Sequence, residues 1–335
     1  LILFPERKMK LIRLAPLALA VFSAAASADM FTANLYDVNN INQDVIDSRL
    51  SMSGPLFNGW DRTFKQGDPW VEAYGMTHRI NRTGDFGKFK NKGAGGVFGY
   101  DHVIADNFRL GLALNGGAGK LKWYDNEGED DLKIDSHWYG ANLYGTWTGK
   151  KVNVIANLGY THQKDDGKHD IEDRNSHALN AGLRFETSFV AGGISFVPYY
   201  GVRFTHLSNG ALKSDGTDNL EPGETPEPSS VNMSGSNIWQ FPVGVNAGFE
   251  YTCAAGWKSR TMIDLAVIPT AGKRKTYFSG EEGGSGRFAN SVTYRGKVGL
   301  QLTKGQHSFG FMYGAAAGAH GSFGQNVTLN YQFMY

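Results

Sequence analysis

The chain has 335 residues, and its 33 Lys and Arg against 32 Asp and Glu give a formal net charge of +1, which leaves no basic excess for binding nucleic acid. Hydrophobic residues make up 41% of the chain and the mean hydropathy is -0.35, so a bundle of membrane-spanning helices is excluded. Aromatic residues nevertheless reach 13%, with 44 glycines and only 10 prolines, a composition typical of amphipathic strands that have one face in hydrocarbon and the other in water.

Residues 9–28 have the layout of a secretory signal peptide. A basic stretch at Met9–Arg13 precedes an apolar run at Leu14–Phe22, and an Ala-Ala-Ser-Ala sequence then offers a cleavage site. The run is too short to span a bilayer, and a buried core helix is the alternative interpretation. We predict that the mature chain starts near Asp29, outside the cytoplasm, and that residues 1–8 lie upstream of the natural start.

A short segment, 29–36, leads into residues 37–58, which we predict to form a linker and helix. Apolar residues recur near helical spacing among polar ones at Val38, Ile41, Val45 and Leu50. At a rise of about 1.5 Å per residue, Asp37–Ser53 reaches roughly 25 Å, the height of the apolar band of an outer-membrane barrel. We therefore expect a mainly polar helix inside a water-filled lumen, and a disordered leader is the alternative.

From Trp70 onward the chain alternates apolar with small or polar residues in segments separated by turns rich in Gly, Asp and Asn. The clearest segment puts Val327, Leu329, Tyr331, Phe333 and Tyr335 on one face and Asn326, Thr328, Asn330, Gln332 and Met334 on the other. Tyr and Trp at the ends of apolar faces suggest interfacial girdles, at Trp70, Trp123, Trp147, Tyr160 and Tyr335. Glycines within these segments, Gly95 and Gly117 among them, indicate bends or the close approach of a lumenal object.

This pattern predicts an all-β fold, a closed antiparallel transmembrane β-barrel spanning residues 60–335, with the N-terminal helix in its lumen. The twelve predicted strands cover 70–82, 92–103, 107–122, 133–148, 151–165, 173–190, 193–208, 236–252, 259–270, 290–302, 306–316 and 325–335. The even number fits a bacterial outer-membrane barrel, as do the alternating short turns and long polar loops, the longest at 209–235 and 271–289. Closure is required because an open edge in lipid would leave backbone groups unpaired.

The order of these segments resembles the autotransporter β-domain, the translocator of type V secretion. The resemblance covers about residues 37–335 and is carried by Trp60-Asp61-Arg62, WVEAYG, GGVFGYDHVIADNFRLGLALNGG, YGANLYGTW, VPYYGVRFTHLS and a terminal strand ending in an aromatic residue. It implies a barrel in the Gram-negative outer membrane that is plugged by a central helix and has exported an upstream passenger. It also implies that Phe333 and Tyr335 belong to the signal read by the barrel assembly machinery.

The same resemblance implies a monomer that is bound by periplasmic chaperones during transit and then contacts outer-membrane lipid and lipopolysaccharide. No nucleic acid partner is expected. Only residues 29–37 lie between the predicted cleavage site and the helix, too few for an exported domain. The protein is therefore either a relative without a passenger or one whose upstream part is missing from the sequence. A signal peptide directly before the helix favours the first interpretation.

Asn39 and Asn40 resemble the junction at which some autotransporters that secrete proteases cut themselves inside the barrel. In that chemistry the side-chain amide of Asn39 would attack its own backbone carbonyl, and Asn40 would become the new N-terminus. Lumenal carboxylates and dry confinement would assist the attack. The alternative is that the two asparagines cap the N-terminus of the helix.

His206-Leu207-Ser208-Asn209-Gly210 resembles the His-x-Ser-Asn-Gly motif of the outer-membrane phospholipase A family. A serine hydroxyl beside a histidine base, oriented by a third polar group, is the arrangement needed for nucleophilic hydrolysis. Strand alternation puts His206 and Ser208 on the outward face near the outer rim. No third partner is identifiable from the sequence, since Asp215 and Asn219 are only nearby.

The remaining candidates for chemistry are weak. The other histidines show no metal-binding spacing, and the single cysteine, Cys253, excludes an internal disulfide, so we predict no metal and no cofactor. We predict a non-enzymatic, outer-membrane barrel of the translocator type that supports export or surface display of an N-terminal segment. A lipid hydrolase that uses His206 and Ser208, and a small diffusion pore, remain as alternatives.

Overall fold

A computed structural model describes residues 30–54, 69–81, 88–124, 132–167, 172–214, 229–253, 256–279 and 284–334. The predicted signal peptide, the Trp60-Asp61-Arg62 motif, Asp215, Asn219 and Tyr335 lie outside the described residues. Within these ranges, no helix combines the length and the apolar run that crossing a bilayer demands.

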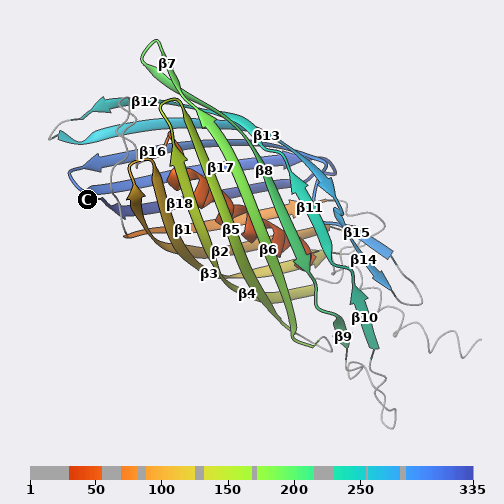
Figure 1. Cartoon of the computed structure of the whole chain (residues 1–335). Coiled ribbons are helices and arrows are strands. Elements are labelled where there is room, and N and C mark those ends of the chain that lie inside the picture. Colours follow the sequence, from red (N-terminus) through yellow and green to blue (C-terminus); the bar gives the residue numbers. More distant parts are fainter. Residues whose placement is uncertain are drawn as a thin grey trace, which may run out of the picture.

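Twelve strands form a closed antiparallel barrel around an N-terminal helix at residues 30–50 (Figure 1), which confirms the predicted fold. The wall consists of β1 (Pro69–Ile80), β2 (Lys88–Ala105), β3 (Phe108–Tyr124), β4 (Leu132–Thr148), β5 (Val152–Asp166), β6 (Arg174–Thr187), β8 (Ile194–Ser208), β11 (Ser236–Gln240) with β12 (Val243–Thr252), β13 (Lys258–Gly272), β16 (Val292–Lys304), β17 (His307–Gly318) and β18 (Phe323–Phe333). The first and last strands pair from Trp70 with Gln332 to Arg79 with Phe323, so the sheet has no open edge.

Strands β11 and β12 form one wall strand, because both pair with β8 on one side and β13 on the other. The interruption falls at Phe241 and Pro242, where proline has no N–H to give to the ladder. The carbonyl of Pro242 still accepts from the backbone N–H of Gly201 at 2.9 Å, and the N–H of Phe241 donates to the carbonyl of Pro269 at 2.9 Å. The wall therefore stays hydrogen-bonded through the break.

The alternation of each strand separates a polar lumen from an apolar outer face. In β5 the side chains of Asn153, Thr161 and Gln163 are buried inside the barrel, whereas Leu158 is 58% exposed on the outside. Trp147 and Tyr160 also face outward, as predicted for an interfacial girdle.

Two other predicted girdle residues, Trp70 and Trp123, instead lie inside the barrel, 3% and 7% exposed. They occupy the inward phase of their strands, where lumenal aromatic side chains need room. At Gly117 a Cβ atom would lie 2.6 Å from the ring of Trp138, so the glycine makes space for that ring. The close lumenal object at Gly117 is thus a wall side chain.

Two of the predicted polar loops contain strands. β9 (Leu212–Ser214), β10 (Ser229–Met233), β14 (Lys275–Ser279) and β15 (Gly284–Arg287) form a separate four-stranded sheet. Figure 1 shows these strands together at one end of the barrel, with β7 (Phe189–Ala191) in a turn at the other end. Such short strands are invisible to a periodicity analysis, because three to five residues do not establish a repeat.

The helix is longer than predicted, since residues 30–36, expected to be a separate segment, are already helical. Nearly every side chain in this part is buried, including those of Thr32 and Asn34 as well as Phe31 and Leu35. A helix surrounded by protein has no solvent-facing stripe, so it carries no amphipathic signal. Asn39 and Asn40 consequently lie in the middle of the helix, so the alternative interpretation that they cap its N-terminus is wrong.

Candidate functional site

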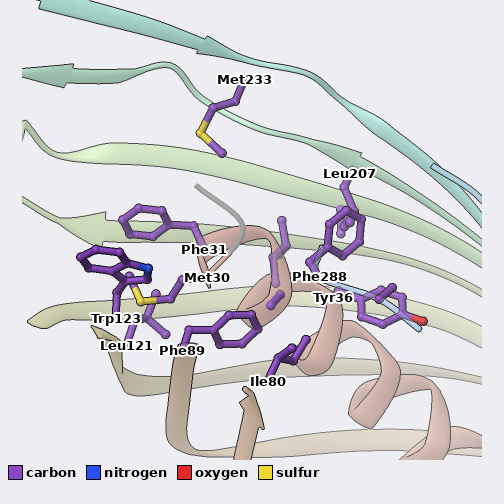
Figure 2. Packing of buried hydrophobic residues seen from close by; sticks show 14 of the residues in the cluster. Met30, Phe31, Tyr36, Ile80, Phe89, Leu121, Trp123, Leu207, Met233 and Phe288 are labelled. Atoms are coloured by element: carbon purple, nitrogen blue, oxygen red, sulfur yellow. The ribbon is translucent and has the colours of Figure 1, made fainter. Parts of the chain in front are cut away.

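The candidate functional site is the lumen, where the helix contacts the wall along its whole length. At its first turns an apolar cluster joins the helix to side chains from the wall strands at the end with the long loops and from the small sheet (Figure 2). The cluster contains Met30, Phe31, Ala33, Leu35, Tyr36, Ile80, Phe89, Leu121, Trp123, Ile134, Ala178, Leu207, Met233, Ile238, Phe288 and Ala289. The predicted water-filled lumen is therefore packed with apolar side chains at this end.

Polar contacts fix the same end of the helix to the long loops. Thr32 donates from Oγ1 to Oδ1 of Asn209 at 3.1 Å and accepts from Oγ1 of Thr276 at 3.1 Å. Asn34 donates from Nδ2 to Oε1 of Gln163 at 3.0 Å. Because Asn209 follows β8 and Thr276 lies in β14, the start of the helix is at the end of the barrel that carries the long connections.

The side-chain amide of Asn39 is held by two neutral wall residues. Its Nδ2 donates to Oγ1 of Thr205 at 3.1 Å, and its Oδ1 accepts from Nδ2 of Asn180 at 2.6 Å. Asn39 is fully buried, and Asn40 follows on the same helix. Self-cleavage between these residues stays a prediction.

Asp44 is the electrostatic centre of the contact between helix and wall. Its carboxylate accepts from Arg203 of β8 at 2.7 Å, and from Arg295 and Lys297 of β16 at 2.6 and 2.9 Å. Arg203 also donates to Asp47, one turn further along the helix, at 2.6 Å. Side chains from opposite parts of the sequence thus neutralise one acidic face of the helix.

Arg49 makes the complementary contact with an acidic wall residue. It donates to both carboxylate oxygens of Asp101, at 2.9 and 3.1 Å, and its guanidinium lies 5.4 Å from the ring centroid of Trp70. Asp101 also accepts from the hydroxyl of Tyr144 at 3.0 Å and pairs with buried Arg109. Burial without these partners would cost several kcal/mol per charge, so the network favours one seating of the helix.

The last turn of the helix is fixed at the opposite end of the barrel. Asn153, which follows the short turn between β4 and β5, donates from Nδ2 to the carbonyl of Leu50 at 3.0 Å. Glu186, at the end of β6, accepts from Oγ of Ser51 at 2.7 Å and from the backbone N–H of Met52 at 2.8 Å. The helix therefore runs through the lumen from the end with long loops to the end with short turns.

A cavity of about 20 Å³ lies beside this last turn, lined by Arg49, Trp70, Glu72 and Gln332 among others. A space of this size accommodates about one water molecule. The space beside the last turn is thus far too small to act as a conduit while the helix is seated.

The predicted pair His206 and Ser208 lies on the outward face of β8, as expected from alternation. The structure brings His206 to Asn237 of β11, with 2.6 Å between Nδ1 and Oδ1. Sequence reasoning missed Asn237 because it lies beyond the long loop, and only the register of β8 with β11 places it directly opposite His206.

At the C-terminal strand, the ring centroid of Phe333 lies 5.3 Å from that of His307. The assembly signal at Phe333 and Tyr335 stays a prediction. Among the described residues, no three His, Cys, Asp or Glu side chains are grouped to hold a metal ion.

A sequence model described as Autotransporter beta-domain matches residues 69–315. Two curated relatives, each named Outer membrane protein A, come from Rickettsia conorii and Rickettsia rickettsii. Each is 22% identical over 219 residues, which is 58% of this chain and 10% or 9% of the relative. The chain thus spans about a tenth of the length of the curated relatives it matches.

Solved structures with the same fold include three autotransporter domains. The translocator domain of NalP from Neisseria meningitidis has a TM-score of 0.64 at 12% identity, over 93% of this chain and 99% of that one. The beta domain of BrkA from Bordetella has 0.59 at 13%, over 81% and 100%. The transport unit of AIDA-I from Escherichia coli has 0.57 at 16%, over 80% and 90%.

Proposed function

Because the chain belongs to the autotransporter β-domain family, whose barrels lie in the Gram-negative outer membrane, we propose that it supports export or surface display of an N-terminal segment. Helix 30–50 is, in this proposal, the trailing part of the exported segment and closes the lumen after export. The export role needs no catalytic side chain, so we propose that it is non-enzymatic.

The direction of the helix is the observation that carries this proposal. Short turns of outer-membrane barrels face the periplasm and long loops face the exterior. Residue 50 is held beside the short turn at Asn153, and Thr32 is held beside the long loops at Asn209 and Thr276. The helix therefore begins at the exterior end of the barrel, as export or display of an N-terminal segment requires.

The charged contacts of Asp44, Asp47 and Arg49 explain how the helix stays seated in the lumen. Each ion pair is shielded from water by the wall, and the apolar cluster at the first turns adds burial of large side chains such as Phe31. We propose that this combination keeps the barrel closed to solutes.

An epitope inserted directly after Asp29 tests the display role. We expect antibody to label this epitope on intact cells, because the helix begins at the exterior end of the barrel. The matched control carries the same epitope between Lys150 and Lys151, in the short turn between β4 and β5, where labelling requires permeabilised outer membrane. Labelling of the Asp29 epitope only after permeabilisation would refute the proposal.

Several finer assignments belong to the same proposal. Residues 9–28 act as a signal peptide, as their layout indicates. The terminal aromatic residues, Phe333 and Tyr335, present the strand to the barrel assembly machinery after transit with periplasmic chaperones. The apolar outer face supports contact with lipid and lipopolysaccharide, since hydrophobic side chains such as Leu158 and Leu329 are more than half exposed there.

A further inference from the structure

Basic side chains gather on the outer face of β1 to β4, at the end of the barrel that carries the long loops. Strand register aligns them across the sheet, since Arg79 is paired with Lys90, Lys90 with Lys122, and Lys122 with Lys133. The exposed or half-buried cations of this region form what we call the basic face: Arg79, Lys88, Lys90, Lys92, Lys120, Lys122 and Lys133.

A second row of the basic face lies two residues nearer the membrane centre, where Lys92 is paired with Lys120. Paired side chains on one face of an antiparallel sheet are about 5 Å apart, and like charges at that spacing repel each other. In the part of the chain that the structure describes, no carboxylate forms a salt bridge with these two lysines or with Lys90 and Lys122. Among the same residues of β1 to β4, Asp135 is the one acidic side chain on this face. The two rows therefore favour the binding of an anion.

Other lysines at the same end of the barrel do have acidic partners. Nζ of Lys164, on the outer face of β5, lies 3.4 Å from Asp166 and 2.7 Å from Asp173. Nζ of Lys213 lies 3.8 Å from Glu172. A lysine row without carboxylates is thus a particular feature of the basic face.

The height of the basic face can be worked out along β4. The exposed aromatic residues Trp147 and Tyr139 are eight residues apart, which is ~21 Å along the membrane normal at a rise of ~3.4 Å and a tilt of ~40°. This separation is close to the ~25 Å apolar band of such barrels, so Tyr139 marks the outer boundary of the hydrocarbon. Lys133, six residues further on, lies ~16 Å beyond that boundary by the same arithmetic.

This height distinguishes between the anionic lipids that could supply phosphate. The polar zone of a phospholipid leaflet is only ~5–8 Å thick, too thin to reach the outer row of lysines. Lipopolysaccharide carries its phosphates on sugars that extend well above its acyl chains. We propose that the basic face binds the phosphates of lipopolysaccharide in the outer leaflet, with lysine ammonium groups as the donors.

The wall directly below the two rows leaves room for the acyl chains of the same molecule. Gly96 and Gly116 are paired on the outer face, and a Cβ atom on either would lie no closer than 3.4 Å to its nearest neighbour. Packing within the protein therefore does not require glycine at these positions. The next pair, Phe98 and Leu114, is 57% and 56% exposed and continues the apolar surface toward the membrane centre.

This inference rests on the orientation in the proposed function, with the long loops outside, and it assigns a place to the contact with lipopolysaccharide proposed there. It does not depend on export, because the basic face and the helix lie on opposite sides of the wall.

An acid-rich segment of the chain is the competing anion. Residues 125–131, between β3 and β4, lie outside the described residues and have the sequence DNEGEDD. We expect them to leave the inner row available, because Lys92 and Lys120 are each four residues inside their strands.

The test measures binding of purified lipopolysaccharide to the full chain folded in detergent. The variant carries Lys90→Gln, Lys92→Gln, Lys120→Gln and Lys122→Gln together, and we expect its Kd to rise at least about thirtyfold. Lipopolysaccharide stripped of its phosphates should bind the wild type and this variant equally weakly. Phosphatidylglycerol, which has one phosphate layer, should bind the wild type at least about tenfold more weakly than lipopolysaccharide.

The matched control removes four exposed lysines from the short-turn end of the barrel, by Lys150→Gln, Lys151→Gln, Lys258→Gln and Lys304→Gln. Its Kd should stay within about threefold of the wild type, because net charge changes equally in the two variants. A heat-sensitive, fast-migrating band on gels establishes that each variant folds. Surface labelling of the epitope after Asp29 should be unchanged in both, so the export proposal is judged by that labelling and the binding proposal by Kd.

Four results would overturn the proposal. They are an unchanged Kd in the variant of the basic face, an equal rise in the control, a difference between wild type and variant that persists without phosphates, and equally tight binding of phosphatidylglycerol. Binding that appears only after the acids of 125–131 are replaced by Asn and Gln would assign the lysines to that segment and overturn it as well.

Discussion

Replacing Asp44 by Asn tests whether ion pairs hold the helix in the lumen. The substitution keeps the shape of the side chain and removes the charge that Arg203, Arg295 and Lys297 share. We expect the helix to leave the lumen more often, because the substitution destabilises only the seated state, in which the three cations depend on Asp44. In the released state water solvates the three cations in both the wild type and the variant, so the free energy of that state does not change.

The magnitude follows from the burial of these groups. The three cationic side chains are 4%, 9% and 10% exposed, and removal of one partner from a buried ion pair typically costs about 3–5 kcal/mol. Two of the cations keep another carboxylate partner, since Asp47 lies 2.6 Å from Arg203 and Asp264 lies 3.5 Å from Arg295. We therefore take the lower value, about 3 kcal/mol, which corresponds to a roughly hundredfold shift in the equilibrium between seated and released helix.

Single-channel recording in planar bilayers measures this shift as the fraction of time spent in the open state. The reference for a fully open barrel is a variant that lacks residues 29–58. The matched control is Gln43→Met, one residue away, whose buried amide has no hydrogen-bond partner in the described part of the chain. Its open fraction should stay within about threefold of the wild type.

Two results would refute this reasoning. The first is an open fraction of Asp44→Asn equal to that of the wild type, which would show that the apolar cluster alone holds the helix. The second is equal opening by Gln43→Met, which would mean that any change on the helix disturbs the seating.

Four further outcomes are expected. Phe31→Ala leaves a cavity that costs about 3–5 kcal/mol at the outer end, so protease added to intact cells should cut the helix faster than in the wild type. Asp101→Asn weakens a fully buried network by about 3 kcal/mol, which should lower the denaturant midpoint of the barrel. Phe333→Ser or loss of Tyr335 should reduce the amount of barrel assembled in the membrane, as read by heat-modifiable migration. If Asn39 cleaves its own bond, the intact mass of the membrane form corresponds to a chain that begins at Asn40, and a longer product rules cleavage out.

The wall of this protein could be predicted from the sequence almost residue by residue. The segment predicted at 133–148 is β4, Leu132–Thr148, and the one predicted at 193–208 is β8, Ile194–Ser208. A strand in a barrel wall faces lipid on one side and the lumen on the other, so apolar and polar residues alternate within each strand. This two-residue period can be recognised from the sequence of a single segment. That rhythm also put His206 and Ser208 on the outer face.

The lumen was harder to predict. The helix was expected from Val38, Val45 and Leu50, yet its first turns at Phe31 and Leu35 were missed, because side chains buried on all sides leave no periodic contrast. The inward positions of Trp70 and Trp123 were missed for a related reason, since tryptophan at the end of a strand suits either face.

The sequence by itself determined the alternation, the number of wall strands and the alternating lengths of the connections. Only the tertiary structure decided which distant side chains meet: Asp44 with Arg295, 251 positions apart, and His206 with Asn237 across the long loop. Register and closure set these pairs, because a shift of one residue between neighbouring strands would turn every partner to the other side of the wall. The register between two strands depends on both of them and cannot be read from the sequence of either one alone.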